Sequence, residues 1–106
     1  MAMTVNRSGF RREIVSDDYI PDIGYLTDYE REQYANGEFG FVGVFAHITL
    51  MLPHGSDGNS IVHAIQSPGV WGIDSRSDED YLNEVFADEC DTLASMLRAL
   101  GVEVQE

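Results

Sequence analysis

The sequence of 106 residues contains no lysine and a single cysteine, Cys90. One cysteine cannot close a disulfide within the chain, and a lone thiol is typical of proteins in a reducing compartment. The N-terminal segment has no apolar stretch of the kind found in signal peptides, and no window approaches the roughly 20 apolar residues of a membrane-spanning helix. We therefore expect a cytoplasmic protein that does not enter a membrane.

Positive charge is scarce, so the net charge is strongly one-sided. Nineteen acidic residues face six arginines, which gives a formal net charge of −13 and a pI near 4.3. Proteins that bind nucleic acid draw most of their affinity from lysine and arginine contacts to phosphates, so direct nucleic-acid binding is disfavoured. A basic protein partner would complement this charge, whereas the simpler interpretation is that the charge only keeps the chain soluble.

The remaining composition is that of one globular domain, with 43% apolar and 24% charged residues. A chain of this length buries roughly 60–70% of the surface that its unfolded form exposes, so a core can form without metal ions or disulfides. We predict a single α+β domain over residues 1–106 that needs no cofactor, with residues 1–15 as a candidate flexible segment.

An antiparallel sheet built on a long hairpin is the first predicted feature. Residues 39–52 are rich in β-branched and aromatic residues and contain no proline, which predicts a central strand. A turn-rich loop of about seven residues then leads into a second strand over residues 60–66. Shorter strands are predicted for residues 11–15 and 70–73.

A short helix is predicted for residues 28–35. Thr27 followed three residues later by Glu30 is a capping-box pattern, and Asn36 with Gly37 supplies a stop signal.

A long amphipathic C-terminal helix is predicted for residues 78–100 and should lie across one face of the sheet. Ser77 with Asp80 resembles a capping box, and Gly101 with Val102 fits a Schellman ending. Its apolar stripe, expected to be largely buried, consists of Leu82, Val85, Phe86, Leu93, Met96, Leu97 and Leu100.

Motifs of known enzymes are missing: there is no Gly-rich phosphate loop, nucleophile elbow, paired-cysteine motif or zinc-protease motif. Cys90 lies at the edge of the apolar stripe and is expected to pack as a small hydrophobic residue. The histidines His47, His54 and His63 all fall in the hairpin. If Leu50 pairs with Val62, His47 and His63 become diagonal neighbours, but no carboxylate or cysteine stands at ligand spacing, so no metal site is predicted.

Glu89 is unusual because it falls in the middle of the apolar face of the predicted C-terminal helix. A carboxylate there needs a hydrogen-bonding partner or a route to the rim, since an unpaired buried charge is costly. We expect an ion pair with Arg11, Arg12 or a histidine. The alternative is a general acid or base that acts with the hairpin histidines in a small enzyme.

The opposite face of the same helix carries four carboxylates, Asp80, Glu84, Asp88 and Asp91, spaced three or four residues apart. A solvated helix face usually contains lysine or arginine as well, but Arg98 is the one basic residue of this predicted helix. Successive carboxylates stand about 5–6 Å apart along the axis, near the phosphate spacing of a nucleic-acid strand. This spacing is the geometric basis for the hypothesis that the protein mimics DNA, whereas the simpler interpretation is a solvated helix face.

The sequence resembles small acidic accessory proteins encoded by phages, plasmids and mobile elements. The resemblance covers about residues 24–102 and rests on the run VWGIDSRSDEDYLNEVFADECDTLASMLRALGV with the preceding YLTDYEREQYANGEFGFVGV. In this type, Trp-Gly-Ile, an acid and Ser lead into an acidic amphipathic helix. Such proteins are similar in character to anti-CRISPR and anti-restriction inhibitors, which implies a bacterial host but no catalytic residue.

The function expected from these observations is non-enzymatic inhibition of a host defence complex, such as a CRISPR effector, through its basic nucleic-acid groove. The alternative function is that of a soluble interaction or regulatory protein, such as an oligomer, that binds its partner through an apolar sheet face. The expected partner-binding residues are Asp74, Asp78, Glu79, Asp80, Glu84, Asp88, Asp91 and Trp71.

Overall fold

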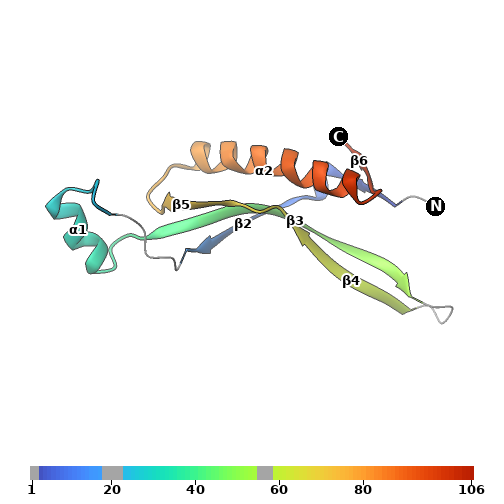
Figure 1. Cartoon of the computed structure of the whole chain (residues 1–106), viewed down its shortest axis with the longest axis horizontal. Coiled ribbons are helices and arrows are strands. Elements are labelled where there is room, and N and C mark those ends of the chain that lie inside the picture. Colours follow the sequence, from blue (N-terminus) through green and yellow to red (C-terminus); the bar gives the residue numbers. More distant parts are fainter. Residues whose placement is uncertain (1–2, 18–22, 55–58) are drawn as a thin grey trace.

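The computed structural model describes residues 3–17, 23–54 and 59–106 of an elongated molecule with principal extents of 61 × 27 × 19 Å. The long helix α2 lies across one face of an antiparallel sheet (Figure 1), which confirms the predicted α+β class. In chain order the elements are β1 (Thr4–Asn6), the 3₁₀ turn η1 (Arg7–Gly9), β2 (Arg11–Ser16), α1 (Asp28–Ala35), β3 (Phe41–His54), β4 (Asn59–Gln66), β5 (Val70–Asp74), α2 (Glu79–Ala99) and β6 (Glu103–Gln105).

Strand β3 is the centre of the sheet. On one edge β2 pairs with it antiparallel from Val42 to His47. On the other edge β4 and β5 follow one another, β4 from His47 onwards and β5 beside the first residues of β3. A strand with neighbours on both edges and apolar side chains on both faces belongs in the middle of a sheet. The predicted strands are confirmed with small shifts at their ends.

The predicted register of the hairpin is wrong by one residue, since Leu50 pairs with His63 and not with Val62. Strand β3 has the expected length of 14 residues but lies two residues later, at Phe41–His54, and β4 begins one residue earlier, at Asn59. Within the expected loop, residues 55–58 lie outside the described residues. A slip of one residue moves each side chain of a strand to the other face. His63 therefore shares a face with Leu50, and His47 lies on the opposite face.

The β4–β5 edge carries two extra residues relative to β3, one between β4 and β5 and one within β5. Gly69 and Gly72 have φ of +87° and +73°, a conformation that bulges use and that glycine adopts without strain. Because of the second bulge, Trp71 and Ile73 lie on opposite faces of the sheet although they are two residues apart.

The main core lies between α2 and the sheet. Leu93 and Leu97 of α2 are fully buried, and Val44 and Ala46 of β3 are equally inaccessible. Burial of the predicted stripe is confirmed for four residues, while Phe86 and Met96 are half-buried. The four confirmed residues are Leu82, Val85, Leu93 and Leu97.

The N-terminus of α2 differs from the prediction by one residue. Asp78, not Ser77, is the N-cap, and its carboxylate accepts a hydrogen bond from the Tyr81 N–H at 2.8 Å. An aspartate at this position satisfies an otherwise unpaired backbone donor and places negative charge at the positive end of the helix dipole.

The C-terminus of α2 forms the predicted Schellman motif. Gly101 has φ of +86°, and the Val102 N–H donates to the Leu97 carbonyl at 2.9 Å. Leu100, expected to be buried, is 67% exposed. It is the C-cap residue, where the backbone reverses towards Gly101, so its side chain lies beyond the part of the helix that covers the sheet.

Both ends of the described chain meet beside the last turns of α2. Strands β1 and β6 pair in parallel, with Val5 opposite Val104 (Figure 1). Phe10 and Val104 are buried in the same cluster as Leu97. Residues 3–15 thus contribute β1, η1 and most of β2 to the fold, and neither β1 nor β6 was expected from the sequence.

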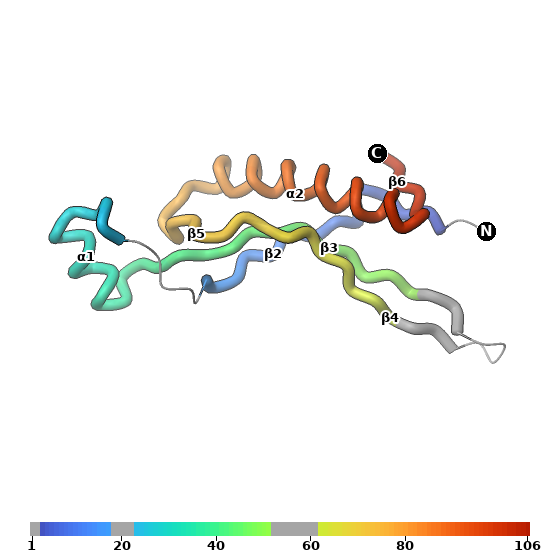
Figure 2. The backbone as a smooth tube through the Cα atoms, viewed as in Figure 1, coloured from blue at the N-terminus to red at the C-terminus, as the bar shows by residue number. Residues whose placement is uncertain are grey.

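Helix α1 has the predicted bounds and the predicted capping box, in which the Thr27 hydroxyl accepts from the Glu30 N–H and the Glu30 carboxylate accepts from the Thr27 N–H. Gly37 follows with φ of +77°. The helix and the β3–β4 hairpin lie towards opposite ends of the molecule (Figure 2). A small separate cluster that contains Leu26 and Phe41 lies in the region of α1.

Candidate functional site

Three exposed carboxylates form a line on the solvent side of α2, which we call the acidic stripe: Asp80, Glu84 and Asp88. They are four residues apart, so they lie on one face of the helix about 6 Å apart along its axis. Within the part of the chain that the structure describes, none of these carboxylates is hydrogen-bonded or ion-paired. Their charge is therefore free to act on a partner.

The other acids expected at this surface have partners in the chain. Glu79 pairs with Arg12 at 2.8 Å, and Arg12 also donates to the Asn83 side chain. Asp91 pairs with Arg7, and this hydrogen bond raises the pKa of the Arg7 guanidinium. Asp78 caps α2. These carboxylates remain at the surface, but an arginine or the N-terminus of α2 partly neutralises the charge of each one.

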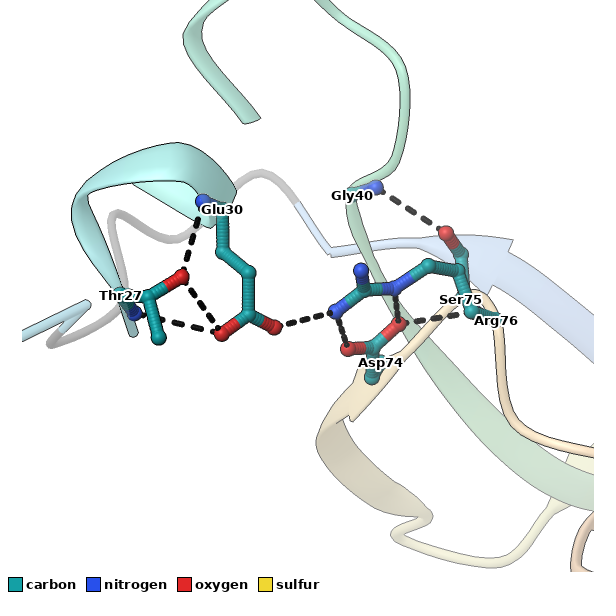
Figure 3. A network of polar contacts seen from close by, with 6 residues as sticks. All are labelled: Thr27, Glu30, Gly40, Asp74, Ser75 and Arg76. Carbon is teal, nitrogen blue, oxygen red and sulfur yellow. Dashed lines mark hydrogen bonds and ion pairs between the residues drawn. The ribbon is translucent and has the colours of Figure 1, made fainter. Parts of the chain in front are cut away.

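Asp74 belongs to a different cluster, which links the end of β5 to α1 (Figure 3). Its carboxylate accepts from Arg76 Nη2 at 2.7 Å and from Arg76 Nε at 3.0 Å, and these bonds lower the pKa of Asp74. Arg76 also reaches Glu30 at 3.3 Å and lies 3.7 Å above the Phe39 ring. The pKa of Glu30 is lowered too, chiefly by the hydrogen bond from the Thr27 backbone.

This cluster predicts a local acid response. A carboxylate with a lowered pKa contributes stability above its unfolded pKa of about 4, and the contribution is lost as the pH falls through the lowered folded value. We expect α1 to become more open at about pH 3 than at pH 7, measured as faster hydrogen exchange of its amides. The Arg76→Gln variant should lose the part of this pH dependence that comes from Asp74, once intrinsic exchange rates are corrected for, and should keep the part that comes from the Thr27 hydrogen bond to Glu30.

The amides of α2 provide the internal control for that measurement, because Arg76 does not contact this helix. An Arg76→Gln protein in which α1 shows the wild-type pH response would contradict the role assigned to the cluster.

Trp71 lies on the sheet face opposite to α2, so it does not join the acidic stripe in one surface. Its ring is 48% exposed, covers Gly43 and stacks on Phe45 with 6.4 Å between ring centroids. The indole N–H donates to the Pro68 carbonyl at 2.9 Å. The sequence suggested an exposed tryptophan, but not the face on which it lies. The one local signal for the bulge was Gly72, since an isolated glycine inside a strand pattern often marks a bulge.

Glu89 is buried, with 7% of its surface exposed, and joins α2 to the bulge between β4 and β5. Its Oε1 accepts from the Ser67 hydroxyl at 2.9 Å and from the Gly69 N–H at 2.6 Å. The Ser67 hydroxyl in turn accepts from the Ala46 N–H at 3.0 Å. The expected ion pair with an arginine or a histidine is therefore wrong, because a hydroxyl and a backbone amide satisfy this carboxylate.

The groups named for an enzymatic site are not gathered in one place. His47 contacts Glu13 at 3.0 Å on the sheet face opposite to α2. His63 is exposed on β4, while the Glu89 side chain is buried between α2 and the sheet, where it bonds to Ser67. A general acid or base must reach the group whose proton it moves, and these three side chains do not share a cleft.

A cavity of about 420 Å³ lies between η1 and α2, lined among others by Arg7, Phe10, Phe86 and Cys90. Cys90 is 6% exposed and packs in the main core, which confirms its expected role as a small apolar side chain. Burial raises the pKa of its thiol, so the reactive thiolate is disfavoured at neutral pH.

Within residues 3–17, 23–54 and 59–106, no three histidine, cysteine, aspartate or glutamate side chains are placed to hold one metal ion. In the same ranges, no helix has the length and apolar character needed to cross a membrane. Comparisons with known protein families, with curated proteins and with solved structures find no match for this chain.

Proposed function

We propose that this chain is a non-enzymatic inhibitor from a phage or another mobile element, and that the acidic stripe on α2 binds the basic nucleic-acid groove of a host defence complex. The observation that carries the proposal is the set of three exposed carboxylates, Asp80, Glu84 and Asp88, which lack a partner within the described part of the chain. A groove lined with lysine and arginine is the surface that complements such a line of charges.

The stripe is held rigidly because the other face of α2 is part of the core. Leu93 and Leu97 are fully buried against the sheet. The helix backbone that carries the three carboxylates is therefore already ordered before binding, and only their side chains lose conformational freedom, which lowers the entropic cost of association. A nucleic-acid strand presents its phosphates to a protein groove in a similar linear order.

The distribution of arginine also supports the proposal that the stripe binds another molecule. Arg12 and Arg7 compensate Glu79 and Asp91, which flank the stripe in the sequence, whereas no carboxylate of the stripe pairs with an arginine among the described residues. Like charges four residues apart on a helix destabilise it by about 0.2–0.5 kcal/mol per pair. Repulsion between the three carboxylates thus destabilises α2 slightly, and binding to a basic partner would relieve this repulsion.

A CRISPR effector is the first class of target to test, because its guide-target duplex lies in a positively charged channel that contacts the nucleic-acid backbone. The resemblance to phage and mobile-element accessory proteins supports the same choice.

The test is phage plating on bacterial strains that each carry one such defence system, with the chain expressed from a plasmid. We expect it to restore plaque formation on at least one strain, and the triple variant Asp80→Asn, Glu84→Gln, Asp88→Asn to lose this effect. Binding of the chain to the purified effector should weaken as salt is raised, since screening acts on exposed charges. Thermal unfolding should show the triple variant to be as stable as the wild type or slightly more so.

A matched control changes the same number of charges outside α2, with neutral amides at the exposed positions Glu32, Glu38 and Glu103. This control should inhibit like the wild type. If the stripe variant inhibits fully, or if both variants lose activity equally, the acidic stripe is not the binding surface.

A further inference from the structure

The centre of the sheet is almost free of charge. Of the nineteen acidic residues and six arginines, only Asp57 falls between Glu38 and Asp74, and it lies outside the described residues. The described residues of β3, β4 and the bulge that follows therefore carry no ionised aspartate, glutamate or arginine. In a chain of net charge −13, these are the longest described segments without an ionised carboxylate.

Part of this stretch extends beyond the rest of the sheet as a two-stranded ribbon (Figures 1 and 2). Strand β2 pairs with β3 only as far as His47, and from there to His54 only β4 is paired with β3 among the described strands. Two-stranded ribbons are marginally stable alone, and unpaired strand edges readily associate.

Among the residues whose side chains are described, the face of the ribbon directed away from α2 is uncharged, mostly apolar and exposed. Met51 and Val62 pair directly across the two strands and are 66% and 61% exposed. Thr49 and Ala64 form the next pair on this face and are also exposed. We call these four residues the ribbon face. Cross-strand apolar pairs are normally covered where a sheet is stable.

The molecule also exposes more surface than a compact monomer of its size. Its accessible surface is 7055 Å², whereas a compact folded monomer of this mass exposes about 5,900 Å². The radius of gyration is 18.0 Å, compared with about 13 Å for a compact domain of this length. The excess is comparable to the roughly 800 Å² that each partner buries in a standard protein interface.

We propose that the chain forms a dimer in which the ribbon face packs on the ribbon face of a second copy across a two-fold axis. A symmetric contact needs a patch that complements itself, and an uncharged apolar patch does so. The acidic remainder of the surface repels another copy. A basic partner, by contrast, has no charge to meet on the ribbon face and is drawn to the acidic stripe, which lies on the other side of the sheet.

The dimer would leave the stripe on each α2 free, because each stripe lies on the side away from the ribbon contact. Two stripes on one particle could bind two sites of a symmetric target, which raises the apparent affinity when the distance fits. The dimer itself does not depend on the proposed inhibitory function.

Sedimentation equilibrium of the purified chain tests the proposal without any host protein. From about 1 to about 200 µM, we expect the mass to rise from 11.8 kDa to twice this value. Raising NaCl from about 0.05 to about 0.5 M should tighten the dimer by roughly tenfold, since screening reduces repulsion between two acidic chains. Binding through the acidic stripe has the opposite salt dependence.

The variant Met51→Glu, Val62→Glu should remain monomeric up to about 200 µM, with the circular dichroism spectrum of a folded chain because both side chains are exposed. The control variant Tyr29→Glu, Leu100→Glu adds the same charge at positions that are 71% and 67% exposed outside the ribbon, and it should dimerise like the wild type. A monomeric wild type, a dimer that survives the ribbon variant, or equal loss in both variants would overturn the proposal.

Discussion

Ser67→Ala is expected to lower the free energy of unfolding by about 2–5 kcal/mol, a large share of the roughly 5–15 kcal/mol of a typical domain. The Ser67 hydroxyl accepts from the Ala46 N–H and donates to the Glu89 carboxylate, and all three residues are buried. Without the hydroxyl, a buried N–H has no partner and a buried carboxylate keeps one donor. Urea unfolding followed by circular dichroism measures the loss.

The Glu89→Leu variant should be destabilised to a similar degree, because it leaves the Ser67 hydroxyl and the Gly69 N–H without their acceptor. The double variant of Ser67 and Glu89 should lose less than the sum of the single losses, since both changes remove the same hydrogen bond. Ser95→Ala on the exposed side of α2 is the matched control and should change stability by less than about 0.5 kcal/mol. A loss below about 1 kcal/mol in Ser67→Ala would contradict this account.

Gly43→Ala is expected to displace Trp71 from the sheet. A Cβ at this position would stand 2.3 Å from a ring carbon of Trp71, a distance that real side chains do not reach. The ring would have to leave its stack on Phe45 and its hydrogen bond to Pro68. Steric overlap of this kind costs about 1–3 kcal/mol. Trp71 is the one tryptophan of the chain, so its fluorescence should shift to longer wavelength and report the displacement directly.

Gly40→Ala is the control for that experiment. A Cβ on Gly40 would meet no atom within 4 Å, and its φ is negative or extended. Its free energy of unfolding should match that of the wild type within about 0.5 kcal/mol. Its tryptophan emission should have the wild-type wavelength. Unchanged emission in Gly43→Ala would mean that the ring does not lie over this glycine.

The features predictable from the sequence are those set by neighbouring residues. Helix α1 could be bounded because Thr27, Glu30 and Gly37 specify its two ends by local hydrogen bonds and backbone conformation. Helix α2 could be predicted from its apolar period, and β3 from its β-branched and aromatic residues. The stripe was also visible, because residues four apart on any helix share a face.

Features that depend on contacts between distant segments could not be predicted in this way. The hairpin register depends on where β3 ends and β4 begins. An error of one residue in the predicted register placed His63 on the wrong face of the sheet. Glu89 was recognised as unusual, but its partner Ser67 is 22 residues away and acquires its place through a bulge. Nothing local predicts that Arg7 and Arg12 compensate two acids of α2, which left only part of the expected acidic surface unpaired.

The parallel pairing of β1 with β6 has a consequence for the order of folding. The Thr4 side chain bonds to Glu103, 99 residues further along the chain. A contact of such long range closes a loop that contains nearly the whole domain, so it forms only after the intervening elements have collapsed. During synthesis, the edge of the core around Phe10 and Leu97 stays uncovered until β6 has emerged. We therefore expect the segment before β2 to complete the domain late, although it precedes the other elements in the sequence.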